Sequence, residues 1–454
     1  MKSSTAAEAV AILASFAVLG GCSAARPAPP GAIPWVAPAP LAKEDLPDLT
    51  ASPLALADVL QAALSGNAGL SASEHSWEAA RYRPEQVSSY PDPFVMIDGS
   101  VKEVVSRNGP VEGGLKVQQS IPFPGKLTLR GEVAEQEAFI AWDRYAAKGL
   151  DLVARVKQAY HDLYWAERAL VITAESRALL EQILPVANRQ FAVAQVTQQD
   201  VLRAEIELVK LKQDVADLQD MAQIARARLN RLLNRRDAEP LGSPAKIEVK
   251  QLETTLEELL ERADLDRPAL HAARRAIERS KQAKSLALLD FFPDFVASFG
   301  YSPIGRTNQP GAPDPGRDAW GFGLGLSIPL WWGKNQARLR EREERLAADR
   351  FTLEQLTHDT SYEVVTLYFR VQIAHRQVEL YRDSVVPLSR QALEVANTAY
   401  SAVPPKVDFE SLIDNWRRVL SYELKLERSR ADFQQRLAEL ERVVGSNLTN
   451  KVQK

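Results

Sequence analysis

The residue best placed for covalent chemistry is Cys22, the single cysteine of the 454-residue chain. It follows Leu19-Gly20-Gly21 and a short apolar run that begins at Ala9. A run this short is typical of a removable export signal, because a membrane-spanning helix needs about 20 apolar residues. The pattern matches a bacterial lipobox, so we expect cleavage before Cys22 and acylation of its thiol, which tethers the chain to a membrane. A plain signal peptide with an incidental cysteine is the alternative.

No other group of residues forms a recognisable reaction centre. The sequence contains no Walker loop, no His-Glu-x-x-His motif, no nucleophile elbow and no dinucleotide-binding fingerprint. His161 and His358 each precede an aspartate, but neighbouring residues of a helix point in different directions, so we expect surface or packing roles. We therefore predict that the protein is not an enzyme and has no cofactor and no metal site. A net charge of −3 lacks the basic excess of nucleic-acid binders, so no nucleic-acid partner is expected.

The elements around these residues occur twice. Ser120-Ile121-Pro122 recurs as Ser327-Ile328-Pro329, and Asp200 recurs as Asp408. A period of about 200 residues is far longer than the 20–50 residues of solenoid repeats, so we predict a duplicated fold. Each copy contains a helical stretch, two strands, a very long helix, a short break and a last helix. The predicted segments are a lipoprotein signal peptide (1–21), an acylated Pro-rich tether (22–53), repeat 1 (54–240), repeat 2 (241–446) and a C-terminal tail (447–454). Within the repeats, strands are expected at about 94–123 and 295–331, and helical hairpins at about 127–234 and 335–445.

The long helices carry heptad patterns. Ranges 127–194 and 335–402 each predict a helix of about 100 Å, bent where Pro185 and Pro387 remove a hydrogen bond. Apolar residues in steps of four and three predict knobs-into-holes packing and left-handed supercoiling. In the second long helix these residues are Leu367, Val371, Ala374, Val378, Tyr381, Val385, Leu388, Ala392, Val395 and Ala399. In the last helix of repeat 1 they are Val201, Ala204, Leu208, Leu211, Val215, Leu218, Ala222, Ala225, Leu229 and Leu232.

The short breaks after the long helices predict antiparallel hairpins with tips far from the strands. Asp200 and Asp408 follow the two breaks. Each aspartate either caps a helix by accepting amide protons or lines a lumen with charge. The tip residues that we single out are Gln195, Val196, Thr197, Gln198, Asp200, Val403, Pro404, Pro405, Lys406 and Asp408.

One strand has bulky apolar residues at every second position and small residues between them. The bulky residues are Trp320, Phe322, Leu324, Leu326, Ile328 and Leu330. A period of two predicts a strand with two different faces, and a membrane β-strand turns its bulky face to lipid. A half-buried strand of a soluble sandwich is the alternative. Because four strands cannot close a barrel and lipid does not tolerate an open sheet edge, several chains must contribute strands.

These features together resemble the outer-membrane efflux (TolC) family over nearly all of the mature chain. Ser120–Glu135 (SIPFPGKLTLRGEVAE) and Gln195–Leu208 (QVTQQDVLRAEIEL) resemble its heavy-metal branch. The resemblance implies a mainly α-helical homotrimer with a twelve-stranded β-barrel in outer-membrane lipid, continued by a periplasmic coiled-coil barrel. It also implies two partners, a periplasmic adaptor (membrane-fusion) protein and an inner-membrane pump of the resistance-nodulation-division type. The hairpin tips of such proteins meet the adaptor and form the constriction.

The function expected from the resemblance is a passive outer-membrane exit duct of a tripartite efflux pump. Heavy-metal cations are the expected cargo, and drugs or type I secreted proteins are alternatives. A structural periplasmic lipoprotein, whose coiled coils bridge envelope layers, is a less favoured reading. The strands discriminate between the two, because a bridging protein does not need a lipid-facing barrel.

Overall fold

The computed structural model of the protein describes residues 47–193, 195–307, 315–401 and 407–448, with the side chains of 100–105 left out. The described residues divide into two compact units. Unit 1 lies within 76–142 and 272–354, and unit 2 lies within 47–75, 143–271 and 355–448. Within the described part of the chain, no helix combines the length and the apolar composition needed to cross a membrane.

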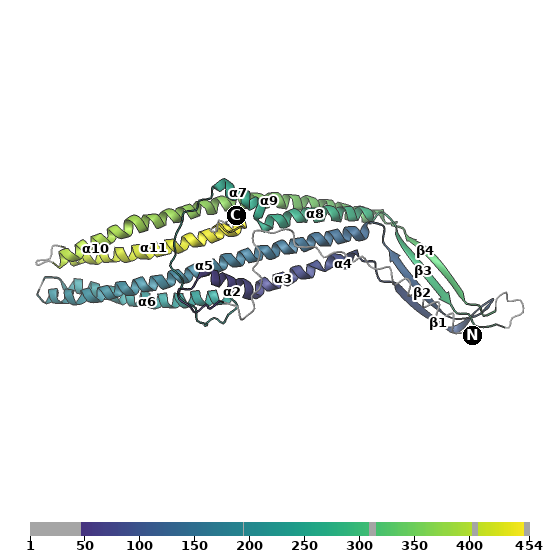
Figure 1. Ribbon diagram of the computed structural model, residues 1–454, viewed down its shortest axis with the longest axis horizontal. Helices are drawn as coiled ribbons and strands as arrows, with labels where there is room; N and C mark the ends of the chain where they lie inside the picture. The colour runs from purple at the N-terminus through teal and green to yellow at the C-terminus, as the bar shows by residue number, and fades with distance from the viewer. Residues whose placement is uncertain (1–46, 194, 308–314, 402–406, 449–454) are drawn as a thin grey trace. The chain divides into compact units, whose positions relative to one another are not determined.

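The order of elements is repeated along the chain (Figure 1). The first series is α2 (Leu56–Gly66), α3 (Ala68–Arg81), α4 (Arg83–Ser88), β1 (Phe94–Ser106), β2 (Gly109–Ile121), α5 (Lys126–Ala192) and α6 (Gln198–Leu232). The second series is α7 (Leu256–Asp266), α8 (Pro268–Leu289), β3 (Asp294–Ser302), β4 (Ala319–Ser327), α9 (Trp332–Leu380), the π-helical turn η2 (Tyr381–Val385), α10 (Val386–Tyr400) and α11 (Phe409–Val444).

Unit 1 contains an antiparallel sheet in the order β1-β2-β3-β4, and its register separates the side chains into two faces. Directly opposite residues share a face, and pairs such as Phe299 with Phe322 alternate with pairs such as Ser298 with Gly323. The apolar face carries Val95, Ile97, Leu115, Val117, Ile121, Phe295, Ala297, Phe299, Tyr301, Trp320, Phe322, Leu324 and Leu326, with Gln119 as a polar exception. The small and polar face carries Asp98, Lys116, Gln118, Ser120, Ser298, Gly300, Gly321, Gly323, Gly325 and Ser327, with Phe94, Met96 and Val296 as apolar exceptions.

The last strand is shorter than the sequence pattern indicates. β4 ends at Ser327, so Ile328 and Leu330 lie in the segment that leads into α9 and not on the strand. The physical reason is Pro329, which has no backbone N–H to donate to a ladder and fits poorly within a strand. Alternation of apolar residues continues through this segment, which is why the sequence pattern alone overextended the strand.

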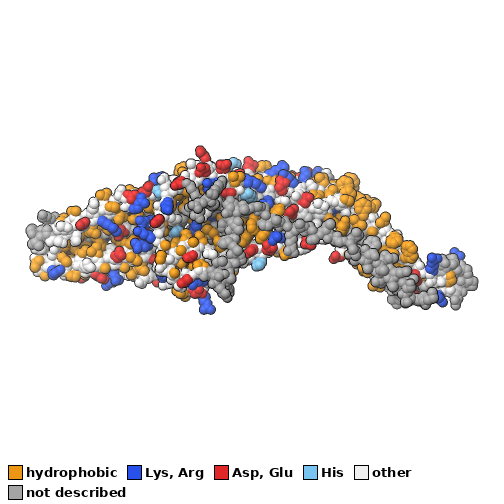
Figure 2. Space-filling view, viewed as in Figure 1, with side chains coloured by type: hydrophobic (Ala, Val, Ile, Leu, Met, Phe, Trp, Pro, Cys, Tyr) orange, Lys and Arg blue, Asp and Glu red, His pale blue; other side chains and the backbone are white. Residues whose placement is uncertain are grey.

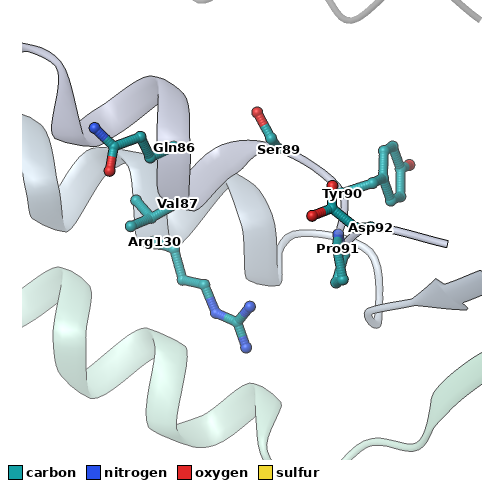
Figure 3. A pocket seen from close by; sticks show the side chains of 7 residues that line it. All are labelled: Gln86, Val87, Ser89, Tyr90, Pro91, Asp92 and Arg130. Atoms are coloured by element: carbon teal, nitrogen blue, oxygen red, sulfur yellow. The ribbon is translucent and has the colours of Figure 1, made fainter. Parts of the chain in front are cut away.

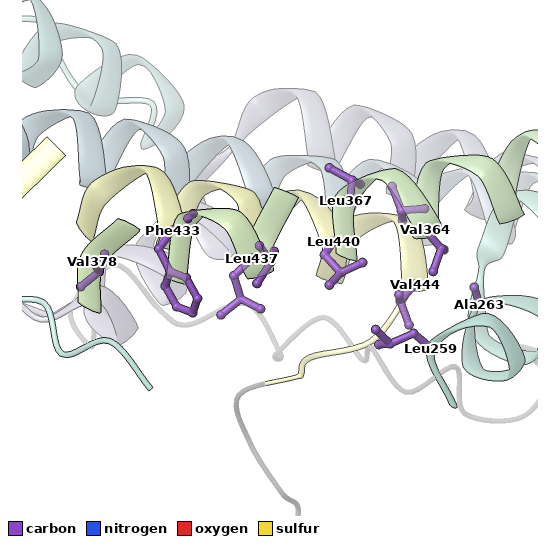
Figure 4. Close-up of a cluster of buried hydrophobic side chains, with 12 residues drawn as sticks. Leu259, Ala263, Val364, Leu367, Val378, Phe433, Leu437, Leu440 and Val444 are labelled. Carbon is purple, nitrogen blue, oxygen red and sulfur yellow. The ribbon is translucent and has the colours of Figure 1, made fainter. Parts of the chain in front are cut away.

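Unit 2 contains most of the two helical hairpins, since α5 and α9 begin in unit 1 and continue into unit 2. The heptad prediction for α6 is confirmed, because all ten predicted residues from Val201 to Leu232 are buried or half-buried. A second cluster joins α7, α9 and α11, where Leu367 and Val378 lie with Phe433 and Leu437 (Figure 4). The coiled-coil pattern therefore marks real packing surfaces in both hairpins.

The heptad prediction for the second long helix is wrong from Leu388 to Val395. Up to Val385 it holds, because Leu367, Val371, Ala374 and Val378 are buried and Tyr381 and Val385 are half-buried. Beyond it Leu388 and Val395 are 63% and 69% exposed. The buried residues lie one position later and are Val386, Ala396 and Tyr400, with half-buried Leu393 between them.

The π-helical turn η2 causes this shift. The Val386 N–H donates to the carbonyl of Tyr381, five residues back, so the turn holds one residue more than an α-helical turn. Pro387 follows at once and cannot donate to the carbonyl four residues before it. The equivalent Pro185 lies inside α5, which remains α-helical around it. The two repeats therefore differ at the same point of their long helices.

Deleting Ser384 from η2 is expected to leave the thermal unfolding temperature nearly unchanged. The deletion removes the one extra residue, so the turn can close as α-helix while every later side chain keeps its face. Deleting Gln182, an exposed residue of α5, rotates the helix end by about 100° per residue and should lower that temperature by several degrees. Circular dichroism of the two full-length variants in detergent makes the comparison, and equal losses would contradict this account of η2.

Candidate functional site

The tip of the first hairpin is closed by a capping box. α6 begins after Thr197, whose hydroxyl accepts a hydrogen bond from the Asp200 N–H at 3.3 Å. The Asp200 carboxylate in turn accepts from the Thr197 N–H at 3.0 Å. The N-cap is therefore Thr197, and the prediction that Asp200 itself is the N-cap is wrong. Asp200 is the third residue of α6. The side chains of Thr197 and Asp200 each accept a hydrogen bond from the other residue's backbone N–H, so two backbone donors at the start of the helix are satisfied.

The tip of the second hairpin follows the prediction more closely. Asp408 is the N-cap of α11, and its carboxylate accepts from the Ser411 N–H at 3.0 Å. Hydrogen bonds from Ser411 hold the pKa of Asp408 below its usual value. Of the other predicted tip residues, Gln195 and Val196 precede the Thr197 cap, whereas Val403, Pro404, Pro405 and Lys406 lie outside the described residues, as does Cys22.

Ion pairs connect the two hairpins close to these tips. Arg203 of α6 lies 2.8 Å from Glu410 of α11, and Arg417 of α11 lies 2.8 Å from Glu207 of α6. Burial raises the pKa of Glu207, but hydrogen bonds from Arg417 and Lys210 outweigh it and leave that pKa lowered. An apolar cluster from all four hairpin helices lies with these pairs and contains Leu180, Ala187, Val201, Ala204, Leu211, Ala396, Tyr400, Phe409, Leu412, Ile413 and Trp416.

Sequence reasoning missed these ion pairs. A usable signal existed, because Arg203 and Glu410, like Glu207 and Arg417, stand at nearly equivalent places in the two repeats. If equivalent helices of a duplicated fold pack side by side, opposite charges at equivalent positions can meet. The pairs show that α6 and α11 do so in unit 2.

The sheet places most of the predicted bulky residues together. Trp320, Phe322, Leu324 and Leu326 share one face of β4, and Leu324 is 94% exposed. Figure 2 shows hydrophobic side chains gathered over β3 and β4. Because β1 and β4 are the outer strands of the order, the sheet also leaves an unpaired edge at each side among the described residues. Open edges and an exposed apolar face call for a further binding surface.

A shallow pocket of about 490 Å³ lies in unit 1 where α4 leads into β1 (Figure 3). Its lining includes one cation, Arg130, and one anion, Asp92, together with Ser89 and Tyr90. It is open to solvent and lacks the enclosed apolar walls of most small-molecule sites. Across the described part of the chain, no three His, Cys, Asp or Glu side chains lie close enough together to hold a metal ion.

The chain combines a two-faced antiparallel sheet in unit 1 with paired helical hairpins in unit 2. The family description of outer membrane efflux proteins matches residues 59–235 and 259–446. The chain therefore belongs to the outer membrane efflux protein family, whose members are channels of the outer membrane and not enzymes.

Solved structures agree in fold. The outer-membrane channel OprN is 22% identical, with a TM-score of 0.72 over 87% of this chain and 91% of that chain. The open state of the MtrE outer membrane channel of Neisseria gonorrhoeae is 22% identical, with a TM-score of 0.72 over 88% and 91%. The transmembrane channel CusC is 19% identical, with a TM-score of 0.72 over 86% and 92%. No curated protein sequence matches the chain significantly.

Proposed function

We propose that three copies of this protein form the exit duct of a tripartite efflux pump. The observation that carries the proposal is the four-stranded sheet of unit 1, with one apolar face, one small and polar face, and two open edges. In hydrocarbon every backbone N–H and C=O needs an internal partner. Copies that join β4 of one chain to β1 of the next remove the open edges, and three copies of four strands give a twelve-stranded barrel.

The two faces then have separate tasks. The face with Phe322 and Leu324 contacts lipid, and the face with Gly321 and Gly323 lines the lumen. A Cβ atom added at Gly300 or Gly321 would meet no atom within 4 Å, so this face leaves room for water and solute. The duct performs no chemistry, because an inner-membrane pump supplies the energy. A periplasmic adaptor engages the hairpin tips around Gln195–Asp200 and Val403–Asp408.

Heavy-metal cations are the proposed cargo. The support is the resemblance of Ser120–Glu135 and Gln195–Leu208 to the heavy-metal branch of the family. A conduit needs no high-affinity ligands, since the pump and the adaptor select the ion. Deleting the gene is expected to lower the tolerated concentration of divalent metals more than that of drugs. The opposite pattern would overturn the cargo assignment and leave the duct intact.

Conductance tests the duct itself. The purified full-length protein is expected to form water-filled pores in planar bilayers, closed for most of the recording. Absence of any conductance, including after Asp408→Ala at the tip, would contradict a channel. A heat-denatured sample of the same preparation is the control for detergent artefacts.

Acylation at Cys22 is proposed as a second attachment to the membrane. Radioactive palmitate is expected to label the wild-type chain and not the Cys22→Ala variant. The proposed barrel does not depend on the acyl chain, so this variant should still form trimers. Equal labelling of the two chains would rule out acylation at Cys22.

A further inference from the structure

The corner between the sheet and the helices of unit 1 contains a buried ion pair at the inner strands β2 and β3. Lys126 begins α5 shortly after β2, and its ammonium lies 2.8 Å from the carboxylate of Asp294, the first residue of β3. The same carboxylate accepts a hydrogen bond from the Phe123 N–H at 2.7 Å. Because Lys126 is only 4% exposed, the ion pair is an enclosed contact between the two repeats.

The duplicated fold has a second place for this ion pair, and one chain leaves it incomplete. Lys126 follows a glycine, and so does its equivalent Lys334. Asp294 follows a proline, and so does its equivalent Asp92. Both equivalents are exposed, and within the described ranges neither side chain has a hydrogen bond or an ion pair. Arg130 lines a shallow pocket together with Asp92 but does not form an ion pair with it (Figure 3).

The backbone around the two lysines supports their equivalence. The Lys126 N–H donates to the Phe123 carbonyl at 3.0 Å, and the Lys334 N–H donates to the Trp331 carbonyl at 3.1 Å. Each long helix therefore starts from the same kind of turn. At this turn Trp331 takes the place that Phe123 has in the first repeat.

An aromatic stack is incomplete in the same way. Phe123 stacks on Phe292, with ring centroids 4.7 Å apart. Phe292 and Tyr90 each directly precede a Pro-Asp pair, so Tyr90 is the equivalent of Phe292. Trp331 and Tyr90 are 78% and 65% exposed. The charge pair and the ring pair that join the inner strands thus each have two separate halves at the outer strands β4 and β1.

The order of the strands explains why these halves stay apart in one chain. Lys126 and Asp294 meet because β2 and β3 are neighbours. Lys334 follows β4 and Asp92 precedes β1, so they lie at opposite edges of the sheet. If β4 of one copy lies beside β1 of the next, as in the proposed barrel, the boundary between copies repeats the arrangement of the inner strands.

We propose that Lys334 of one copy forms an ion pair with Asp92 of the next copy. This inference rests on the proposed trimer, and it names the contact that aligns the copies. Trp331 then stacks on Tyr90 beside the ion pair, as the equivalent rings do within the chain. Enclosed ion pairs can specify register, because a misplaced partner leaves a buried charge uncompensated. The ion pair therefore fixes how far β4 is advanced along β1 of the next copy.

The strand pairing agrees with this register. β2 pairs with β3 so that Gln119 lies opposite Ala297. With the spacing of the two repeats, Gln119 corresponds to Leu326 and Ala297 corresponds to Val95. Leu326 and Val95 both lie on the apolar face. The register that completes the ion pair thus also puts apolar residues opposite each other, whereas a slip by one residue would oppose the two faces.

Exchange of the two charges tests the contact in the full-length protein. Lys334→Asp alone and Asp92→Lys alone each place like charges together. Each is expected to lower by several degrees the temperature at which trimers dissociate on a mild detergent gel, and the two combined should restore it. Asp92→Lys with Arg340→Asp is the matched control and should not restore it. Arg340 is exposed on the same helix as Lys334 but lies about 120° around it.

A carbodiimide reaction tests the same contact in the wild-type protein, which carries no substitution that could impair folding. The reagent joins an amine to a carboxylate in contact with it, with loss of water and without a spacer. A peptide that links Lys334 to Asp92 is expected in the dimer and trimer bands of a denaturing gel. The positive control is a peptide that links Lys126 to Asp294 within one chain. Asp92→Asn should remove the first peptide and keep the second.

The outcomes separate the ion pair from the duct. Trimers that lack the linked peptide, or whose stability the charge exchange does not restore, would overturn the ion pair and leave the proposed duct intact. A peptide that links Lys334 to Asp92 in the monomer band would also overturn it, because the two groups would then meet within one chain. Wild-type protein that remains monomeric in detergent would contradict both the ion pair and the proposed trimer.

Discussion

Leu324→Arg is expected to abolish assembly in the outer membrane, whereas Gly321→Arg in the same strand is expected to preserve it. Leu324 is 94% exposed on the apolar face of β4. Gly321 lies on the opposite face, where an added Cβ meets no atom within 4 Å. An arginine on the lipid face near the bilayer midplane costs about 2–4 kcal/mol per copy, so three copies lose roughly 6–12 kcal/mol.

The measurement is the amount of trimer in outer-membrane fractions, run unheated on a mild detergent gel at equal expression. The two variants carry the same charge in the same strand. A difference in their trimer yields is therefore caused by the face of the sheet on which the arginine lies, and not by the arginine itself. Gly321→Arg is further expected to reduce conductance, because its side chain enters the lumen. Equal trimer yields for both variants would contradict the assignment of the faces.

Removing the ion pairs between the hairpins is expected to increase the open population of the channel. Arg203→Ala with Arg417→Ala breaks two pairs per chain and six in a trimer. A single exposed pair contributes little, but the pairs of the three chains act together, so we expect their joint removal to destabilise the arrangement that we assign to the closed channel. If the hairpins shift between a closed and an open packing, the ratio of open to closed channels rises about tenfold for every 1.4 kcal/mol by which the closed packing is destabilised.

Single-channel recording in planar bilayers measures this effect. Arg189→Ala is the matched control, because Arg189 is an exposed arginine of α5 near the tip whose side chain bonds to Pro185 of its own helix. It should leave the open population unchanged. The charge exchange Arg203→Glu with Glu410→Arg should restore the closed state that Arg203→Glu alone disturbs. A channel that stays closed in the double alanine variant would show that these pairs do not hold the tips together.

The periodic features of the fold could be read from the sequence. The α6 heptad is a regular pattern with one buried face, and every predicted residue from Val201 to Leu232 packs inward. Most of the strand faces follow from a period of two. The structure adds exceptions such as Gln119 and Met96, and it shows that β4 ends before Pro329. The cap at Thr197 was also readable, since Thr197 and Asp200 have the spacing of a capping box.

The shift at η2 could not be read from the sequence, for a specific reason. Leu388 and Val395 continue the four-and-three spacing of the buried residues of α9. Extending the heptad pattern beyond α9 therefore predicts that these two residues are buried. In the structure they belong to a different face, because the extra residue of η2 advances the helix. A helix with two apolar faces offers two registers, and only the packing partner decides which one is buried.

The hairpin ion pairs were hidden for another reason. Arg203 and Glu410 are far apart in sequence, and neither has an unusual neighbour that marks it. Their contact depends on equivalent helices of the two repeats lying side by side. Local spacing does not contain that arrangement, so only the comparison of equivalent positions in the two repeats could have indicated the pairs.

The mass of the intact particle tests the central claim most directly. The full-length protein, extracted from outer membranes and released from detergent in a mass spectrometer, is expected to have the mass of three mature chains. It is also expected to keep that mass until the chains unfold, because joining copies is what pairs the edges of β1 and β4. A folded single chain that stays soluble and stable without detergent would contradict the account.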